Sequence, residues 1–287
     1  MIGNHRTTII ASHFVVVIVV MMTVGLSKGP EMEPEELVTR HLNAIGDTET
    51  REGIQSRIVR GVGRFEVVVG GAGQLEGAAS ILSQGNKLRL SIDFNHLNYS
   101  AERITFDGEE CYVGNIEPGV RSQLGNFFYQ YDDLIKEGLL GGVLSTAWPL
   151  ANIEDRGPKL DYRGLKKIND LELLELRYRM KKGGRDFTIN LYFDPQTFYH
   201  IASIYKLRIS ARMGRSPEAS ARQRETRLTL EEWFDDFQTR QGLELPSRWT
   251  IRFTIEGNRG TSVAKWDMAF DRALHNMSIN PQLFVLE

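Results

Sequence analysis

The chain has 287 residues, of which 41% are hydrophobic and 25% are charged, with 35 basic and 37 acidic side chains. This composition is ordinary for a folded domain with a real core, so it excludes an intrinsically disordered chain. The net charge of −2 argues against a nucleic-acid-binding protein, because such domains usually carry a basic excess.

The amino terminus is typical of an export leader. Arg6 precedes an aliphatic run from Ile9 to Leu26. The uninterrupted apolar part, which His13 limits, is shorter than the roughly 20 residues that span a bilayer. We therefore expect residues 1–29 to be a signal peptide or an N-terminal membrane anchor. Residues 30–287 are expected to form a single domain outside the cytoplasm, since no linker composition divides them.

The first element after the leader is predicted to be a short amphipathic helix. Apolar residues from Leu37 to Ile45 recur at helical spacing, acidic residues Glu35 and Glu36 occupy the first turn, and Gly46 follows. Negative charge near a helix amino terminus is favourable, and glycine commonly ends a helix.

The next segment alternates between apolar and polar residues, which indicates strands with one buried face. Gly85-Asn86 and Asp107-Gly108 are strong turn signals within it. The pattern predicts strands over residues 56–69, 77–84, 87–94 and 102–106, and a further strand over 111–116.

The pattern changes to a helical one between Arg121 and Leu150. Phe127, Tyr131, Leu134 and Ile135 fall on one helix face. Apolar residues continue to Trp148, but Gly141-Gly142 interrupts any single helix. We predict one or two short helices, inserted between two runs of strands.

Alternation resumes after Pro158. Three consecutive strands are predicted between Arg163 and Ile209, and Gly242 to Pro246 is predicted to be a turn. Further ordered or strand segments are predicted at Arg227–Phe237 and around Trp249 and Trp266.

An arginine-rich loop is predicted over Met213 to Glu225, with Arg215, Arg222 and Arg224. The plain interpretation is a solvated loop. The alternative is contact with anionic lipid headgroups, which attract basic residues by about 1 kcal/mol each.

No motif of catalysis, metal binding or cofactor binding is present in the sequence. Gly70 to Gly73 lacks the lysine of a phosphate loop, and no Gly-x-Ser-x-Gly elbow exists. The histidines are scattered and Cys111 is the single cysteine, so neither a metal cluster nor an internal disulfide is expected. Cys111 is interpreted as a buried strand residue. We expect no catalytic residues, no metal and no cofactor, hence not an enzyme.

A broad sheet with one apolar face must be covered on that face, and the helical insert is the segment that can cover it. Two interpretations remain open. Phe127, Tyr131, Leu134 and Trp148 either complete an ordinary core or form a lid over an apolar cavity. A cavity is expected where a curved sheet is too wide for its own side chains to fill.

Taken in chain order, these parts resemble a known family. They are the leader, the helix with Glu35, Leu37 and Val38, the long strands, the helical insert, the turn Tyr192-Phe193-Asp194-Pro195, and the late segment from Phe234 to Pro246. This order resembles the bacterial lipoprotein-sorting carriers (LolA-like) and the related envelope-stress sensor proteins. The resemblance implies a mainly β fold with α: a strongly curved, incompletely closed antiparallel half-barrel that helices cap.

The resemblance also implies the site. Inward-facing residues of the strands would form a lipid-binding cavity, and the insert with Phe127, Tyr131, Leu134 and Trp148 would form its lid. The expected cavity residues are Leu90, Ile92, Leu174, Leu176, Ile189 and Leu191. In the carriers one buried arginine fastens the lid, and the sequence does not single out its counterpart.

Two hypotheses of function follow. The first is a periplasmic, non-enzymatic protein that holds the acyl chain of a lipid or lipoprotein, for transport to the outer membrane. The second is an envelope sensor or interaction module with the same fold that transports nothing. Its partner would be an inner- or outer-membrane protein, and an uncleaved leader would tether it to the inner membrane.

Overall fold

The computed structural model describes residues 31–184, 186–211, 225–258 and 260–286. The leader and the arginine-rich loop at Met213 to Arg224 lie outside the described residues. Within the described part, twelve strands form one sheet in the order β5-β4-β3-β2-β1-β12-β11-β10-β9-β8-β7-β6. The strands are β1 (Ser56–Val69), β2 (Gln74–Gln84), β3 (Lys87–His96), β4 (Tyr99–Phe106), β5 (Cys111–Val113), β6 (Lys159–Ile168), β7 (Leu171–Arg179), β8 (Phe187–Phe193), β9 (His200–Ile209), β10 (Thr226–Arg240), β11 (Leu243–Gly257) and β12 (Gly260–His275).

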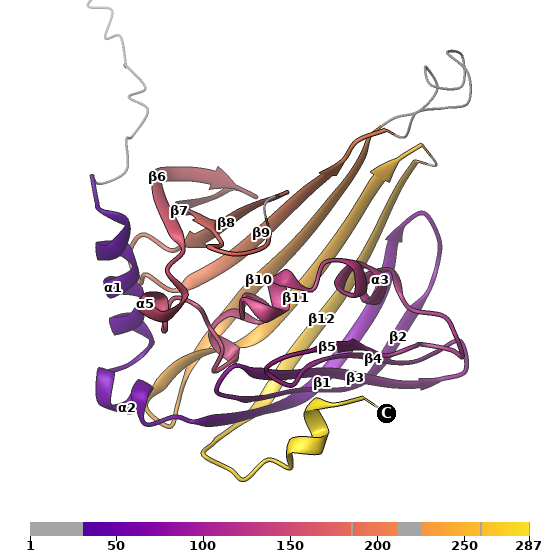
Figure 1. The fold of residues 1–287 in the computed structure, drawn as a ribbon, viewed down its shortest axis with the longest axis horizontal. Helices are drawn as coiled ribbons and strands as arrows, with labels where there is room; N and C mark the ends of the chain where they lie inside the picture. The colour runs from indigo at the N-terminus through magenta and orange to yellow at the C-terminus, as the bar shows by residue number, and fades with distance from the viewer. Residues whose placement is uncertain (1–30, 185, 212–224, 259, 287) are drawn as a thin grey trace, which may run out of the picture.

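All neighbouring strands pair antiparallel, and the two end strands β5 and β6 do not pair with each other. The sheet bends so that its two flanks turn toward each other, with the helical segment between them (Figure 1). The predicted fold is confirmed: a mainly β, open, antiparallel half-barrel with helices.

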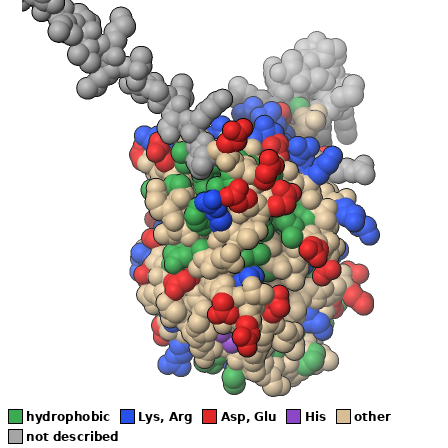
Figure 2. Space-filling view, turned by 90° about the vertical axis from the view of Figure 1, so that its left-hand side faces the viewer, with side chains coloured by type: hydrophobic (Ala, Val, Ile, Leu, Met, Phe, Trp, Pro, Cys, Tyr) green, Lys and Arg blue, Asp and Glu red, His purple; other side chains and the backbone are tan. Residues whose placement is uncertain are grey.

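Short helices account for the remaining regular structure. Helix α1 contacts β6 and β11, and it buries Leu37, Val38, His41 and Ile45. The helical elements are α1 (Pro34–Ile45), α2 (Thr48–Glu52), α3 (Gln123–Gln130), α4 (Asp133–Lys136), the 3-10 turn η1 (Gly142–Leu144), α5 (Ile153–Arg156) and the 3-10 turn η2 (Pro281–Phe284). The face that carries α1 shows acidic, basic and hydrophobic side chains intermixed (Figure 2).

The helical insert contains two short helices, α3 and α4, as predicted. The single helix face expected for Phe127, Tyr131, Leu134 and Ile135 is interrupted, because Tyr131 follows the last residue of α3 with φ −133°. Phe127, Leu134 and Ile135 are nevertheless buried.

Two predictions about the second half of the sheet are wrong. Four strands, not three, fill the segment up to Ile209, because β6 starts at Lys159. This edge strand has no regular alternation of buried and exposed residues, and its register shifts near Gly164 (φ 74°). An edge strand interrupted in this way lacks the regular alternation of apolar and polar residues that identifies a strand in the sequence.

The predicted turn from Gly242 to Pro246 is also wrong. Only Gln241 and Gly242 turn, with φ 50° and 83°, and Leu243 to Pro246 begin β11. Pro246 still pairs in register with Phe237, but proline offers no N–H to the ladder, which made the segment resemble a turn.

Candidate functional site

The six predicted cavity residues, called here the wall, lie on both flanks of the curved sheet. Leu90 and Ile92 lie on β3, whereas the other four lie on β7 and β8, with at least six strands between them and β3 in the sheet order. Curvature brings both groups into one continuous core. The wall is thus a single apolar surface on the inner side of the sheet.

The segment Arg121–Leu150, called here the lid, packs against this inner side. The ring of Phe127 lies 5.0 Å from that of Phe253 on β11 and 6.0 Å from that of Phe187 on β8, between ring centroids. Tyr131 lies 5.8 Å from Phe187. Leu134 and Trp148 belong to the same core as the wall, while Tyr131 is only partly buried.

The lid fills the space above the wall. Every wall side chain is 0–1% exposed, and Leu139, Leu140, Val143 and Leu144 of the lid are at most 4% exposed. A side chain that lined even a water-sized cavity would expose surface to it, so the wall contacts protein on all sides. In this structure the wall is therefore closed to solvent.

A buried carboxylate attaches the middle of the lid to the sheet. Glu232 of β10 is fully buried, and its carboxylate accepts hydrogen bonds from the backbone N–H of Gly141 (2.8 Å) and the hydroxyl of Tyr205 (2.7 Å). Gly141 has φ 81°, the left-handed region that favours glycine. Burial raises the pKa of Glu232 to about 7.

A second buried carboxylate holds the start of the lid. Glu102 of β4 accepts hydrogen bonds from the hydroxyls of Ser122 (2.9 Å) and Tyr99. The same Ser122 hydroxyl caps α3 by accepting the N–H of Gly125 at 2.7 Å. Burial raises the pKa of Glu102 to about 7.

A buried arginine attaches the second half of the lid. Arg57 of β1 is 6% exposed; its Nη1 donates to the carbonyl of Val143, and its Nε donates to His275 Nε2 at 3.2 Å. Nearby, the N–H of Thr146 donates to the hydroxyl of Ser83 on β2 at 3.0 Å. No sequence pattern singles out Arg57 among the arginines, although the resemblance implied one buried arginine that holds the lid.

Trp148 joins the lid to α1 and β9. Its indole N–H donates to His41 Nε2 at 3.1 Å, and its ring stacks on His200 with centroids 4.6 Å apart. His41 Nδ1 lies 2.9 Å from the carbonyl of Phe198, so a neutral ring that donates there and accepts from Trp148 satisfies both contacts. Burial lowers the pKa of His41 to about 4, in keeping with that neutral ring.

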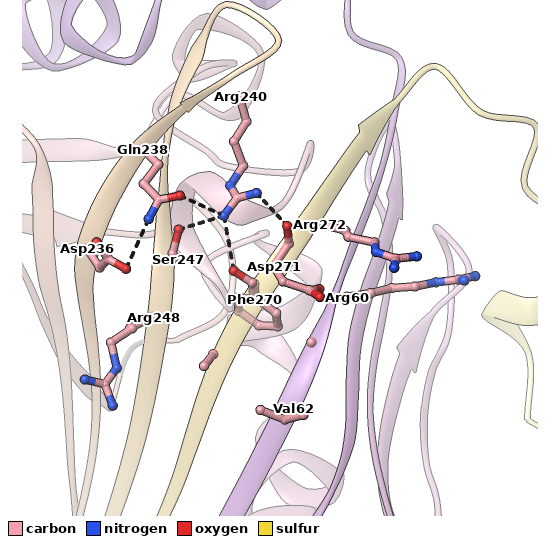
Figure 3. Close-up of a pocket in the computed structure, with 12 residues that line it drawn as sticks. Arg60, Val62, Asp236, Gln238, Arg240, Ser247, Arg248, Phe270, Asp271 and Arg272 are labelled. Carbon is pink, nitrogen blue, oxygen red and sulfur yellow. Dashed lines mark hydrogen bonds between the residues drawn. The ribbon is translucent and has the colours of Figure 1, made fainter.

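A pocket of about 740 Å³ lies on the other face of the sheet, where Arg60 and Val62 are exposed while their neighbour Val59 is buried. Arg240 lines this pocket, and its guanidinium donates to the hydroxyl of Ser247 and to the carbonyls of Phe270 and Asp271 (Figure 3). This open hollow contains no residue of the wall or the lid.

Among the described residues, no group of three or more His, Cys, Asp or Glu side chains is placed to hold a metal ion. In the same part of the chain, no helix combines the length and the apolar character that crossing a membrane requires. Cys111 is a free, half-buried cysteine on β5.

No protein-family model matches the chain, and no curated protein matches its sequence. One similar solved structure is a DUF1329 family protein from Desulfovibrio piger, with 12% identity, a TM-score of 0.41, and coverage of 88% of this chain and 98% of that chain. Another is the LolA superfamily protein NE2245 from Nitrosomonas europaea, with 13% identity, a TM-score of 0.45, and coverage of 89% and 99%. A third is an outer membrane lipoprotein-sorting protein domain from Vibrio parahaemolyticus, with 8% identity, a TM-score of 0.40, and coverage of 88% and 95%. Two of these three similar structures are thus a LolA superfamily protein and a lipoprotein-sorting protein domain.

Proposed function

We propose that this chain is an exported, non-enzymatic binding protein that holds the acyl chain of a lipid or lipoprotein between the lid and the wall. The observation that carries the proposal is the way the lid is attached. Apolar lid side chains cover the wall, while the lid's attachments at Glu232, Glu102, Arg57 and Ser83 are hydrogen bonds to the sheet's side chains, as are those of Tyr178 and Tyr205 to the lid. A cover of this kind can be released without breaking any strand.

An acyl chain can replace the lid side chains with little net change in apolar burial. Each buried CH₂ group contributes about 0.8 kcal/mol, so a chain of about fourteen carbons contributes about 11 kcal/mol before ordering costs. A lid that moves away exposes apolar surface of its own and of the wall. Because these two large terms nearly offset each other, the few hydrogen bonds of the lid decide which state is populated.

Loosening one of these attachments is therefore expected to strengthen ligand binding. In Ser83→Ala the N–H of Thr146 loses its acceptor, which weakens the closed state by about 1 kcal/mol. The apparent affinity for a fluorescent fatty acid should rise about fivefold, since the competent fraction of open molecules rises by that factor. Fluorescence titration of both proteins measures this ratio.

Ser91→Ala is the matched control, because Ser91 is also a buried serine on a neighbouring strand but its hydroxyl contacts Asp93 rather than the lid. Its affinity should equal that of the wild type. Equal affinities for the wild type and Ser83→Ala would contradict a lid that competes with the ligand. Absence of fatty-acid binding in all three proteins would refute the acyl-binding proposal itself.

The place of action that we propose is the periplasm, with delivery to the outer membrane through a membrane-protein partner. The aliphatic leader at Ile9 to Leu26 supports export. Mass spectrometry of lipid extracted from protein made in a bacterial host with an intact leader tests cargo and compartment together. Periplasmic protein that consistently carries acyl lipid is the expected result.

The closed interior favours a second candidate, the envelope sensor or interaction module that transports nothing. A core in which all wall residues are 0–1% exposed is what a protein without cargo would have. This candidate predicts that crosslinking in cells captures one dominant membrane protein while the purified protein carries no lipid. Extracted lipid at about one molecule per chain would rule it out.

A further inference from the structure

The guanidinium of Arg57 is a buried charge whose described partners are all neutral. Its Nε and Nη1 donate to the ring of His275 and to the carbonyl of Val143. Among the described residues, no carboxylate lies within 4.0 Å of it, and Nη2 makes no hydrogen bond. Burial of an ion that no opposite charge compensates is costly.

A small pocket of about 70 Å³ lies beside this guanidinium. Arg51 of α2 is a second lining residue, and its described partners, the Gly46 carbonyl and the Thr48 hydroxyl, are also neutral. Ser145 and Thr146 of the lid add polar groups. The space exceeds several times the roughly 10 to 15 Å³ that one water needs, so a phosphate or carboxylate group fits.

The remaining lining of this pocket is apolar and comes mainly from α1, from the lid and from the start of β11. It comprises Leu42, Ile45, Ile54, Val143, Trp148, Ala151 and Leu243. The pocket shares Arg51, Ile54, Thr146 and Ala151 with an open groove of about 600 Å³, which connects it to solvent. Two cations and seven apolar side chains around one pocket match a molecule with an anionic end and an apolar body.

We propose that Arg57, assisted by Arg51, binds the anionic headgroup, a phosphate or a carboxylate, of a lipid whose acyl chain lies under the lid. This inference rests on the proposed function and adds the chemical class of the ligand. The bound anion gives the buried guanidinium an opposite charge and occupies its free Nη2 donors. It also competes with the Val143 carbonyl for Arg57, so headgroup binding weakens one of the lid attachments.

The test compares amphiphiles of equal chain length but different headgroups, below their micelle concentrations. Isothermal titration of dodecyl phosphate, dodecanol and dodecyltrimethylammonium measures the ratio of affinities for each protein. The wild type should bind dodecyl phosphate about ten- to a hundredfold more tightly than dodecanol, the range for hydrogen bonds to a charged group. The ratio is the readout because Arg57→Met also loosens the lid, which changes both affinities together.

In Arg57→Met the ratio should fall to about one, and Arg57→Lys should restore part of it. Arg89→Met is the matched control, since Arg89 is a partly buried arginine whose Nη1 donates to the Leu283 carbonyl outside this pocket. Its ratio should equal that of the wild type. Circular dichroism of each variant shows whether it is folded, and the ratio in Arg51→Gln, expected to be intermediate, gives an independent readout if Arg57→Met does not fold.

Three results would overturn the inference. The first is equal binding of dodecyl phosphate and dodecanol by the wild type, which leaves the acyl-binding function intact. The second is a phosphate preference that survives in Arg57→Met or, if that variant does not fold, in Arg51→Gln. The third is inorganic phosphate alone binding as tightly as dodecyl phosphate, which would make the site one for a free anion. If no amphiphile binds at all, the proposed function fails as well.

Discussion

Trp148→Ala is expected to lower the free energy of unfolding by about 3 to 5 kcal/mol, the range for removal of a buried aromatic side chain. Trp148 is 2% exposed, stacks on His200 and donates its indole N–H to His41. The substitution leaves a cavity where the lid, α1 and β9 meet. It also removes the hydrogen bond that His41 Nε2 accepts from the indole N–H. Urea unfolding followed by circular dichroism measures the loss.

Trp233→Ala is the matched control for this prediction. Like Trp148, Trp233 donates its indole N–H, in this case to the carboxylate of Glu231, but it is only half-buried and packs in a small cluster apart from the main core. Trp233→Ala should lower the free energy of unfolding clearly less than Trp148→Ala. Equal losses in the two variants would contradict the view that Trp148 fixes the lid to the rest of the fold.

Glu232→Gln is expected to gain stability relative to the wild type as the pH rises, by about 2 to 3 kcal/mol between pH 5 and pH 8. Burial raises the pKa of Glu232 from 4.5 to about 7. The folded state therefore binds the proton more tightly than the unfolded state, and stability is lost as the pH rises from about 4.5 to 7. Glutamine is uncharged, so it removes this loss and still accepts the N–H of Gly141.

The difference in free energy of unfolding between the variant and the wild type is needed because buried histidines make the protein more stable, not less, as the pH rises. Burial lowers the pKa of His41 and His275 to about 4, so their contribution is lost as the pH falls from 6.5 toward 4. Urea titrations at both pH values give the difference, with Thr39→Ala as a non-titrating control. A difference that does not change with pH would contradict a carboxylate buried under the lid.

Most of the sheet could be predicted because its strands alternate regularly. The bounds predicted for the first strand, 56–69, agree with β1, and the predicted strand over 87–94 lies within β3. One face of each strand packs on a core and the other faces water, so the period of two survives in the sequence. The alternation is absent in β6, because an edge strand does not bury one face regularly.

The apolar part of the site could be predicted for the same reason, whereas its polar attachments were missed. The signal was nevertheless present. In β10 the inward positions are Leu228, Leu230, Glu232 and Phe234, and Glu102 stands in line with Ile104 in the same way. A charged residue at an inward position is costly to bury, so it marks a contact from another element.

The closure of the lid could not be predicted, because local patterns do not report the volume between two layers. The wall is apolar whether a lipid or the side chains of Leu139 and Leu144 cover it. Periodicity identifies the buried face of an element but not the atoms that bury it. Only the packed structure distinguishes a hollow interior from a filled one.

Photolabelling with a fatty acid that carries a diazirine near its methyl end tests the central claim most directly. The account predicts that irradiation of the complex labels the wall strands β7 and β8 together with the lid, and that Ser83→Ala increases the yield. Peptide mass spectrometry locates the label. Label confined to the outer face around Arg240 and Arg60 would contradict an acyl chain held beneath the lid. So would a labelling yield no higher than that of a short-chain control probe.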